Sequence, residues 1–200
     1  MRASSPILML DTASEYVYLA LLNRRGDVLE DVYRQGKNDH SVTLMPAMAE
    51  MLVKHGVKPT DLSRIIVGIG PGSYTGVRAG VTVAKMLAWS LSIPLSTVSS
   101  LALIASGAPE GAVLVWHDAR NNNGFYGLFN VRKGQLIRLS TDAFGSMDEA
   151  RNTMRYQRDT THGKPNPAVL FASEEINAVD NVHTVAPAYL RQTEAERTKE

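Results

Sequence analysis

The sequence predicts an α/β fold in which helices pack on mixed β-sheets. Two observations support this prediction. In the first half, segments with the pattern of strands alternate with segments of helical periodicity, in the order β-β-β-α-β-α-β-α. The second half starts again with strands, a hairpin, a helix and another strand. This echo predicts two related lobes, residues 1–108 and residues 109–200.

The first lobe is predicted to open with an antiparallel meander. Residues 6–22 read as strand, turn and strand, because residues 11–14 have turn chemistry between two apolar runs. A hairpin turn then leads into a third strand at 28–34. A helix follows within 40–55, with Pro46 either in its first turn or at a kink. The remaining elements are strand, helix, strand and helix, at 64–70, 77–91, 93–98 and 99–107.

The second lobe repeats this alternation in a shorter form. Ser146 with Glu149 three residues later predicts a capping box at the start of a helix over 146–156. The charged carboxyl terminus, 191–200, is predicted as a helical turn or a frayed end. Strands are predicted at 112–119, 124–131, 135–140 and 167–173.

The composition is that of an ordinary soluble globular protein, with 44% hydrophobic and 20% charged residues. A formal net charge of +1 gives no strong field for nucleic acid, so we expect that the chain does not hold RNA alone. The absence of cysteine excludes disulfides and thiolate sites. The amino terminus lacks the apolar run of a signal peptide, and a cytoplasmic location is expected.

Residues 68–80, GIGPGSYTGVRAG, form a glycine-rich turn between a predicted strand and a predicted helix. They lack the Gly-Lys-Ser/Thr end of a P-loop, and also the third glycine and following acid of a dinucleotide fingerprint. The Gly-x-Ser-x-Gly of a nucleophile elbow is missing as well. Two interpretations remain open. The turn either presents a helix amino terminus to an anion, or lets the helix pack closely on the sheet.

Asp11 and Thr12 lie in the turn after the first predicted strand, where they either face phosphate or form an Asx-type turn. The five histidines include no pair with zinc-site spacing, so no metal site is expected in this chain. The candidate phosphate- or nucleotide-facing residues are Asp11, Thr12, Gly70, Gly72, Ser73, Thr75 and Gly76.

Two predicted helices carry residues that suit either a core or an interface with a second chain. The methionines in 40–55 are flexible apolar groups that adapt to different surfaces. Small residues at four-residue spacing in 77–91 allow close helix approach. The candidate interface residues are Met45, Met48, Met51, Leu52, Gly80, Ala84 and Ala88.

Five segments together carry a family resemblance. They are LDTA at 10–13, His40-Ser41 with Pro46, GIGPGSYTGVRAGVTVAKMLA at 68–88, HDAR at 117–120 and PAYLR at 187–191. With these segments the chain resembles the TsaB (YeaZ) family, the accessory subunit of the bacterial tRNA threonylcarbamoyladenosine synthase.

The resemblance implies an actin-like, Hsp70-like (ribonuclease H-like) two-lobed fold, with the second lobe shortened in this chain. It implies a TsaD-like catalytic partner and a TsaE-like ATPase, with the helices of the first lobe as the interface. A second copy of the chain is another candidate partner. The complex transfers threonylcarbamoyl to N6 of adenosine 37 in tRNAs that read ANN codons. The metal belongs to TsaD, and tRNA and ATP or ADP are expected only at the level of the complex.

The leading hypothesis is therefore a non-catalytic scaffold subunit. The alternatives are an independent actin-like nucleotide-binding phosphotransferase and a protease that acts on its partner. The chain lacks a D-x-G-x-T motif, and Ser73 has no matched His-Asp arrangement visible in sequence. One departure from the family is the run Asn121–Asn123, where an acidic residue is usual, so no role of that carboxylate is carried over.

Overall fold

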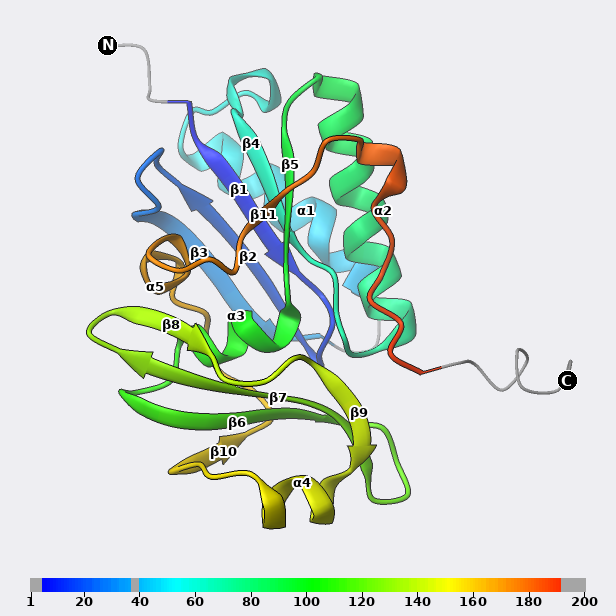
Figure 1. Ribbon diagram of the computed structural model, residues 1–200. Coiled ribbons are helices and arrows are strands. Elements are labelled where there is room, and N and C mark those ends of the chain that lie inside the picture. Colours follow the sequence, from blue (N-terminus) through cyan, green and yellow to red (C-terminus); the bar gives the residue numbers. More distant parts are fainter. Residues whose placement is uncertain (1–4, 37–39, 192–200) are drawn as a thin grey trace, which may run out of the picture.

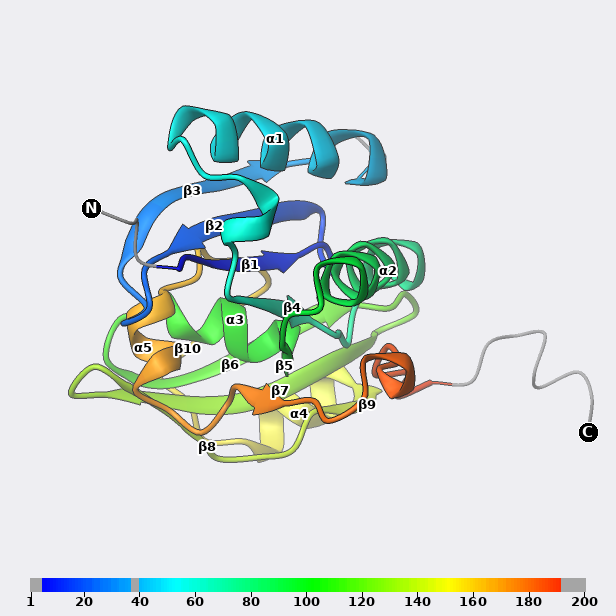
Figure 2. The ribbon, with the colours of Figure 1, turned by 90° about the horizontal axis from the view of Figure 1, so that it is seen from above.

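The computed structural model describes residues 5–36 and 40–191, and for residues 40–42 the backbone alone. Two mixed β-sheets are layered, with helices between them and on the outer side of each sheet (Figures 1 and 2). This arrangement confirms the predicted two-lobed α/β fold. No helix in the described ranges is long and apolar enough to cross a membrane.

The first sheet has six strands in the order β11-β5-β4-β1-β2-β3. The pairs β1–β2 and β2–β3 are antiparallel, whereas β4 and β5 continue the sheet parallel to β1. The predicted opening meander is therefore confirmed. The strands are β1 Ile7–Asp11, β2 Tyr16–Leu22, β3 Val28–Gln35, β4 Arg64–Gly68, β5 Leu95–Val98 and β11 Asn177–Ala178.

The second sheet has the order β10-β6-β7-β8, with β9 paired to β7. The long hairpin β6–β7 forms its centre and turns at 119–122. The strands are β6 Gly111–Asp118, β7 Asn123–Arg132, β8 Gln135–Arg138, β9 Ala143–Ser146 and β10 Arg158–Thr160.

Both faces of β1 are buried, which explains the uninterrupted apolar run at the start of the chain. Leu8 and Leu10 belong to the core under α1 (His40–Lys54) and α2 (Tyr74–Leu91). Ile7 and Met9, on the opposite face, belong to the core that includes α3 (Ser100–Ser106). Two helices thus cover the outer face of the first sheet, while α3 packs on its inner face (Figure 2).

α3 joins the two lobes because it packs against both of them. All of its seven residues are buried, and its apolar side chains share one core with Phe129 and Val131 of β7. Ser99 caps its start by accepting hydrogen bonds from the amides of Leu101 and Ala102. The lobes are therefore connected through a continuous apolar core.

The predicted strand at 167–173 is wrong, because most of it forms the short helix α5, Pro167–Phe171. Asn166 accepts a hydrogen bond from the Ala168 amide, and proline occupies the first helical position. The helix predicted at 146–156 is confirmed in part as α4, Met147–Thr153, with Ser146 as its cap.

The boundary between the predicted lobes needs a correction at the carboxyl end. β11 pairs with β5, and the Ala188 amide donates to the Ile69 carbonyl at 2.7 Å, so residues 177–191 return to the first lobe. The second lobe accordingly ends well before residue 200. Of the predicted charged end at 191–200, residues 192–200 lie outside the described residues.

Most of the predicted interface residues belong to the core of the chain itself. Ala84 is 0% exposed, and the small-residue stripe lets α2 approach the sheet rather than a second chain. Met45, at 45% exposed, is the one predicted interface residue that reaches the surface. The buried ones are Met48, Met51, Leu52, Gly80, Ala84 and Ala88.

The glycines of the 68–80 turn allow close packing against the end of β1. A Cβ atom at Gly72 would overlap the carbonyl oxygen of Ala13, and one at Gly76 would overlap the carbonyl oxygen of Thr12. Both obstacles are backbone atoms, which cannot rotate away. The interpretation as a close-packing turn is therefore supported by the geometry.

We predict that Gly76→Ala lowers the free energy of unfolding by about 2–3 kcal/mol, because α2 must move away from β1. The melting temperature should fall by roughly 5–10 °C. Thr75→Ala is the matched control, since Thr75 is an exposed neighbour in the same helical turn. Equal melting temperatures for the two variants would contradict the packing role of Gly76.

Candidate functional site

The glycine turn ends at the amino terminus of α2, an 18-residue helix. Ser73 caps the helix, and its Oγ accepts a hydrogen bond from the Gly76 amide at 3.3 Å. The Ser73 amide itself donates to the Ala13 carbonyl at 2.7 Å. The first turn of α2 carries no acidic residue, so the positive end of the helix dipole is not neutralised from within the helix.

Asp11 lies beneath this turn, at the end of β1. The Ser100 hydroxyl donates to Asp11 Oδ1 at 2.7 Å and accepts from the Gly70 amide at 2.9 Å. Burial raises the pKa of Asp11 to about 6, although hydrogen bonds from Ser100, Ala13 and Thr12 to the carboxylate act in the opposite direction. The carboxyl group is thus held inside the protein by α3 and the turn.

Thr12 is buried as well and serves the same packing. Its hydroxyl donates to the Gly76 carbonyl at 2.6 Å, within the first turn of α2. Gly80, one helical turn further, has the Thr12 hydroxyl where a Cβ would lie. Thr12 thus fixes α2 to the end of β1.

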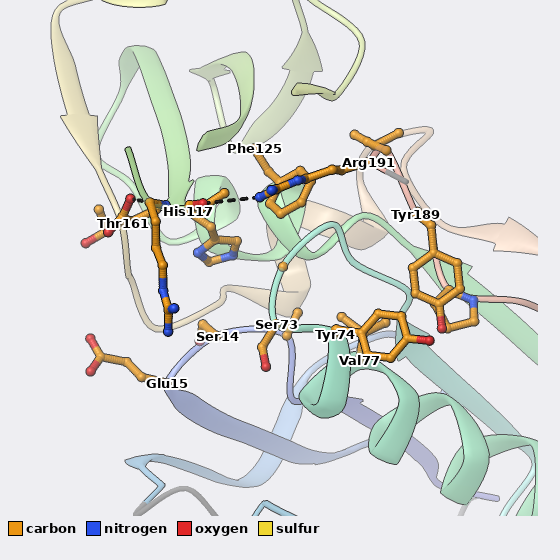
Figure 3. A pocket seen from close by; sticks show the side chains of 18 of the residues that line it. Ser14, Glu15, Ser73, Tyr74, Val77, His117, Phe125, Thr161, Tyr189 and Arg191 are labelled. Carbon is orange, nitrogen blue, oxygen red and sulfur yellow. Dashed lines mark hydrogen bonds between the residues drawn. The ribbon is translucent and has the colours of Figure 1, made fainter. Parts of the chain in front are cut away.

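A cleft of about 890 Å³ opens between the lobes (Figure 3). Its walls come from segments that lie far apart in the sequence, and the turn after β1 faces the end of β6 across it. Among the predicted phosphate-facing residues, Gly72 and Ser73 line the cleft, whereas Asp11, Thr12 and Gly76 are buried behind it. The lining segments are 13–15, 72–74, 117–121 and 187–191, with Val77, Phe125 and Thr161.

His117, on β6, was not among the predicted site residues, yet it stands in this cleft with an unsatisfied nitrogen. Its side chain is 9% exposed, and Nε2 is buried without a hydrogen-bond partner in the described residues. Such a group costs about 1–3 kcal/mol. Burial lowers the pKa of His117 to about 4, so the imidazole is neutral at pH 7.

The acidic side chains of the cleft already have partners inside the protein. Glu15 Oε2 accepts from Gln35 Nε2 at 2.7 Å, and Asp118 Oδ1 accepts from the Arg120 amide at 2.8 Å. Arg191 donates to the Ala119 carbonyl at 3.4 Å. The cleft is therefore balanced in formal charge, with two acids and two arginines.

A separate cluster of ion pairs links the two lobes away from the cleft. Arg138 of β8 pairs with Asp142 at 2.6 Å and with Glu175 at 2.5 Å. Asp142 in turn accepts from the Ser99 hydroxyl of the first lobe at 2.5 Å. This cluster lines a second cavity of about 500 Å³ and ties β8 to the start of α3 and to the returning chain. Arg138 and Asp142 are only four residues apart, but Ser99 and Glu175 come from distant segments, so no local pattern predicts the whole cluster.

Comparison with known proteins identifies the family. The TsaD family model, described as tRNA N6-adenosine threonylcarbamoyltransferase, matches residues 32–166. The "tRNA threonylcarbamoyladenosine biosynthesis protein TsaB" of Bacillus subtilis (strain 168) is 36% identical over 95% of this chain and 96% of its own length. The chain belongs to the TsaB family.

Two further relatives agree. The TsaB protein of Escherichia coli (strain K12) is 36% identical over 57% of this chain and 50% of its own length. The solved structure of YeaZ from Pseudomonas aeruginosa superimposes with a TM-score of 0.78 at 24% identity and covers 93% of this chain and 100% of that chain. The actin-like two-lobed fold of the TsaB family is thus the fold of this chain.

The segments that suggested the TsaB family converge on the cleft. Ala13 of LDTA, the 72–74 turn, the HDAR segment at 117–120 and the PAYLR segment at 187–191 all contribute to its lining. His40 and Ser41 are exceptions, since their side chains lie outside the described part. The family motifs thus coincide with segments that line the cleft, whereas Asp11 and Thr12 themselves lie behind it.

Two buried groups at the site have opposite effects on stability as the pH changes. Asp11 titrates at about 6 when folded against 3.8 in its ordinary state, so its contribution falls as the pH rises between these values. His117 titrates at about 4 against 6.5, so its contribution falls as the pH decreases through this range. Each contribution is roughly 3 kcal/mol, and the two nearly cancel.

We predict that Asp11→Asn makes the chain lose more stability than the native chain on acidification from about pH 6.5 to 4, because His117 is no longer compensated. His117→Gln should gain stability over the same range for the opposite reason. Urea unfolding at a series of pH values measures both differences. A double variant should follow the native slope, and parallel curves for all four proteins would contradict the pKa shifts.

Proposed function

We propose that this chain is a non-catalytic subunit of the apparatus that makes threonylcarbamoyladenosine in tRNA. The main support for this proposal is that the chain is 36% identical in sequence to a TsaB biosynthesis protein over nearly the full length of both chains. In this proposal the chain pairs with a TsaD-like catalytic subunit, works with a TsaE-like ATPase, and meets tRNA and ATP or ADP only through the complex, in the cytoplasm.

The side chains that could have been catalytic are buried or already hydrogen-bonded within the protein, which supports a non-catalytic role. Asp11 lies under the glycine turn, outside the cleft lining, and Ser73 Oγ is occupied as a helix cap. His117 has a pKa too low for a general base at neutral pH, and its Nε2 has no partner among the described residues. These features argue against both the phosphotransferase and the protease alternatives.

Metal chemistry finds no support in the described residues either. No group of three or more His, Asp and Glu side chains is placed there to hold a metal ion. The balanced formal charge of the whole chain, +1, offers little attraction for a tRNA backbone. Catalysis and most RNA contacts are therefore assigned to the partner subunits.

The outer surfaces of α1 and α2 offer a partner-binding face. These helices pack against each other on one side of the first sheet (Figure 2). Both helices carry large apolar side chains that are exposed. Val53 is 80% exposed, Met86 64% and Trp89 66%. Such residues are typical anchors of protein interfaces, and with Met45 they replace the buried stripe as the proposed contact set.

We predict that Trp89→Glu weakens pairing with a co-expressed TsaD-like subunit by at least roughly 2 kcal/mol, because an exposed aromatic anchor becomes a charge. Gel filtration should show separate peaks, and threonylcarbamoyladenosine in cellular tRNA should decrease. The isolated variant should still fold, since Trp89 is largely exposed and its ring meets the ring of His183 edge-on.

Leu139→Glu is the matched control, as Leu139 is 50% exposed in the second lobe. It should pair normally. Ala84→Arg should instead unfold the chain, because Ala84 is fully buried. Normal co-elution of Trp89→Glu with the partner would place the interface elsewhere. Tight ATP binding with turnover by the isolated chain would contradict the proposal of a non-catalytic subunit.

A further inference from the structure

The returning chain, residues 175–191, contacts the second lobe at both of its ends. At one end Glu175 pairs with Arg138 of β8. At the other end the guanidinium group of Arg191 donates to the Ala119 carbonyl at 3.4 Å (Figure 3). Between these two contacts the chain packs on the first lobe, where β11 pairs with β5. The segment therefore connects the two lobes a second time, in addition to α3.

Residues 179–191, the strap, run beside α2 (Figure 1). The ring of His183 meets the ring of Trp89 edge-on, two residues before the end of the helix. At the start of the helix, the ring of Tyr189 packs on that of Tyr74, with ring centroids 5.2 Å apart. The strap therefore follows α2 over nearly its whole length.

Lys85 of α2 attaches the middle of the strap to the helix. Its ammonium group donates to the carbonyl oxygens of His183 at 3.0 Å and of Val185 at 2.7 Å. These carbonyls lie at the end of the short 3₁₀ helix η2, Val182–Thr184, and carbonyl groups at a helix end need donors from outside the helix. A charged donor makes a stronger hydrogen bond than a neutral one. Lys85 thus caps η2 and holds it on α2.

The carboxyl end of the strap rests on the second sheet. The guanidinium carbon of Arg191 lies 5.3 Å from the ring centroid of Phe144 in β9, in addition to the hydrogen bond to Ala119. Phe144 in turn packs on the ring of Phe125 in β7. A displacement of the strap from α2 would therefore change a contact with the second lobe.

We propose that the strap is a brace that sets the separation of the two lobes, and that Lys85 is the positioning residue that keeps it in place. Lys85 fixes η2 on α2, and the Ala188 amide fixes the following residues by its hydrogen bond to the Ile69 carbonyl. Arg191 then transfers this position to the second lobe. α3 holds the lobes together at their shared core, whereas the strap holds them beside the cleft that its last residues line.

The brace also touches the proposed partner-binding face, because His183 meets Trp89. A protein bound at Trp89 contacts the element that sets the separation of the lobes, so partner binding and lobe separation are coupled. This consequence rests on the proposed function, whereas the brace itself does not.

The separation of the lobes is open to direct measurement, because the chain contains no cysteine. Glu50→Cys in α1 and Asn152→Cys in α4 introduce one exposed position for a spin label on each lobe. Double electron–electron resonance on the full-length chain, without a partner, gives the distribution of distances between the two labels. Hydrogen exchange of the Ala188 amide reports the attachment of the strap to the first lobe.

Lys85→Met keeps the length of the side chain and removes the ammonium group. We expect the Ala188 amide to exchange at least about tenfold faster, the effect of losing hydrogen bonds from a charged donor, and the distance distribution to broaden. Lys85→Arg retains a cationic donor and should restore both properties. Lys54→Met is the matched control, because Lys54 pairs with Glu30 away from the strap and should change neither property.

Arg191→Met separates the two attachments of the strap, since it removes the contact with the second lobe and leaves Lys85 in place. It should broaden the distance distribution while the Ala188 amide stays protected. An unchanged distance distribution in either variant overturns the brace, and unchanged exchange in Lys85→Met overturns the role of Lys85. Because the chain is measured without a partner, these outcomes are independent of whether it pairs with a TsaD-like subunit.

Discussion

The hydroxyl group of Ser100 joins three parts of the molecule at one point. It donates to the Asp11 carboxyl group at the end of β1 and accepts from the Gly70 amide of the glycine turn, while its own residue starts the buried helix α3. The backbone adds a second link, because the Ser100 amide donates to the Gly70 carbonyl at 2.9 Å. The position of the turn, the burial of Asp11 and the placement of α3 between the sheets all depend on this junction.

This junction explains why the carboxyl group at the end of β1 does not reach the cleft of this actin-like frame. Asp11 occupies the end of a central strand, where an open carboxylate could approach a ligand, but the turn and α3 enclose it. α2 is drawn against β1 by the Thr12–Gly76 hydrogen bond, and glycine at positions 72 and 76 makes that approach possible. The lobes are further tied by the cluster around Arg138, so the geometry favours a fixed scaffold for partner subunits.

Much of the fold could be predicted because its signals are local. The apolar run of β1, the hairpins and the glycine endings of the helices each reflect backbone geometry or two-sided burial. The short apolar run at 167–173 was wrongly predicted as a strand, because about five apolar residues suit a strand as well as a helix. The signal that favoured a helix was Asn166 followed by Pro167. The pairing of β11 with β5 is a contact between distant segments, which no local pattern encodes.

The site was predictable only as a set of segments. Small-residue spacing in α2 indicated close packing correctly, but spacing alone does not say whether a helix packs on its own sheet or on another chain. Ser100 and His117 escaped notice because their importance comes from burial beside distant groups. Exposed anchors such as Trp89 could not be separated from core residues before the orientation of the helices was known.

The central claim is that Asp11 is a buried structural carboxyl group rather than a ligand-facing one. The most direct test is a ¹³C NMR titration of the Asp11 carboxyl carbon in the full-length chain, with and without Mg²⁺. The account predicts a pKa near 6, well above the ordinary 3.8, that does not change when Mg²⁺ is added. A midpoint near 3.8, or a shift on addition of Mg²⁺, would show that the carboxylate is open to the cleft and would contradict the account.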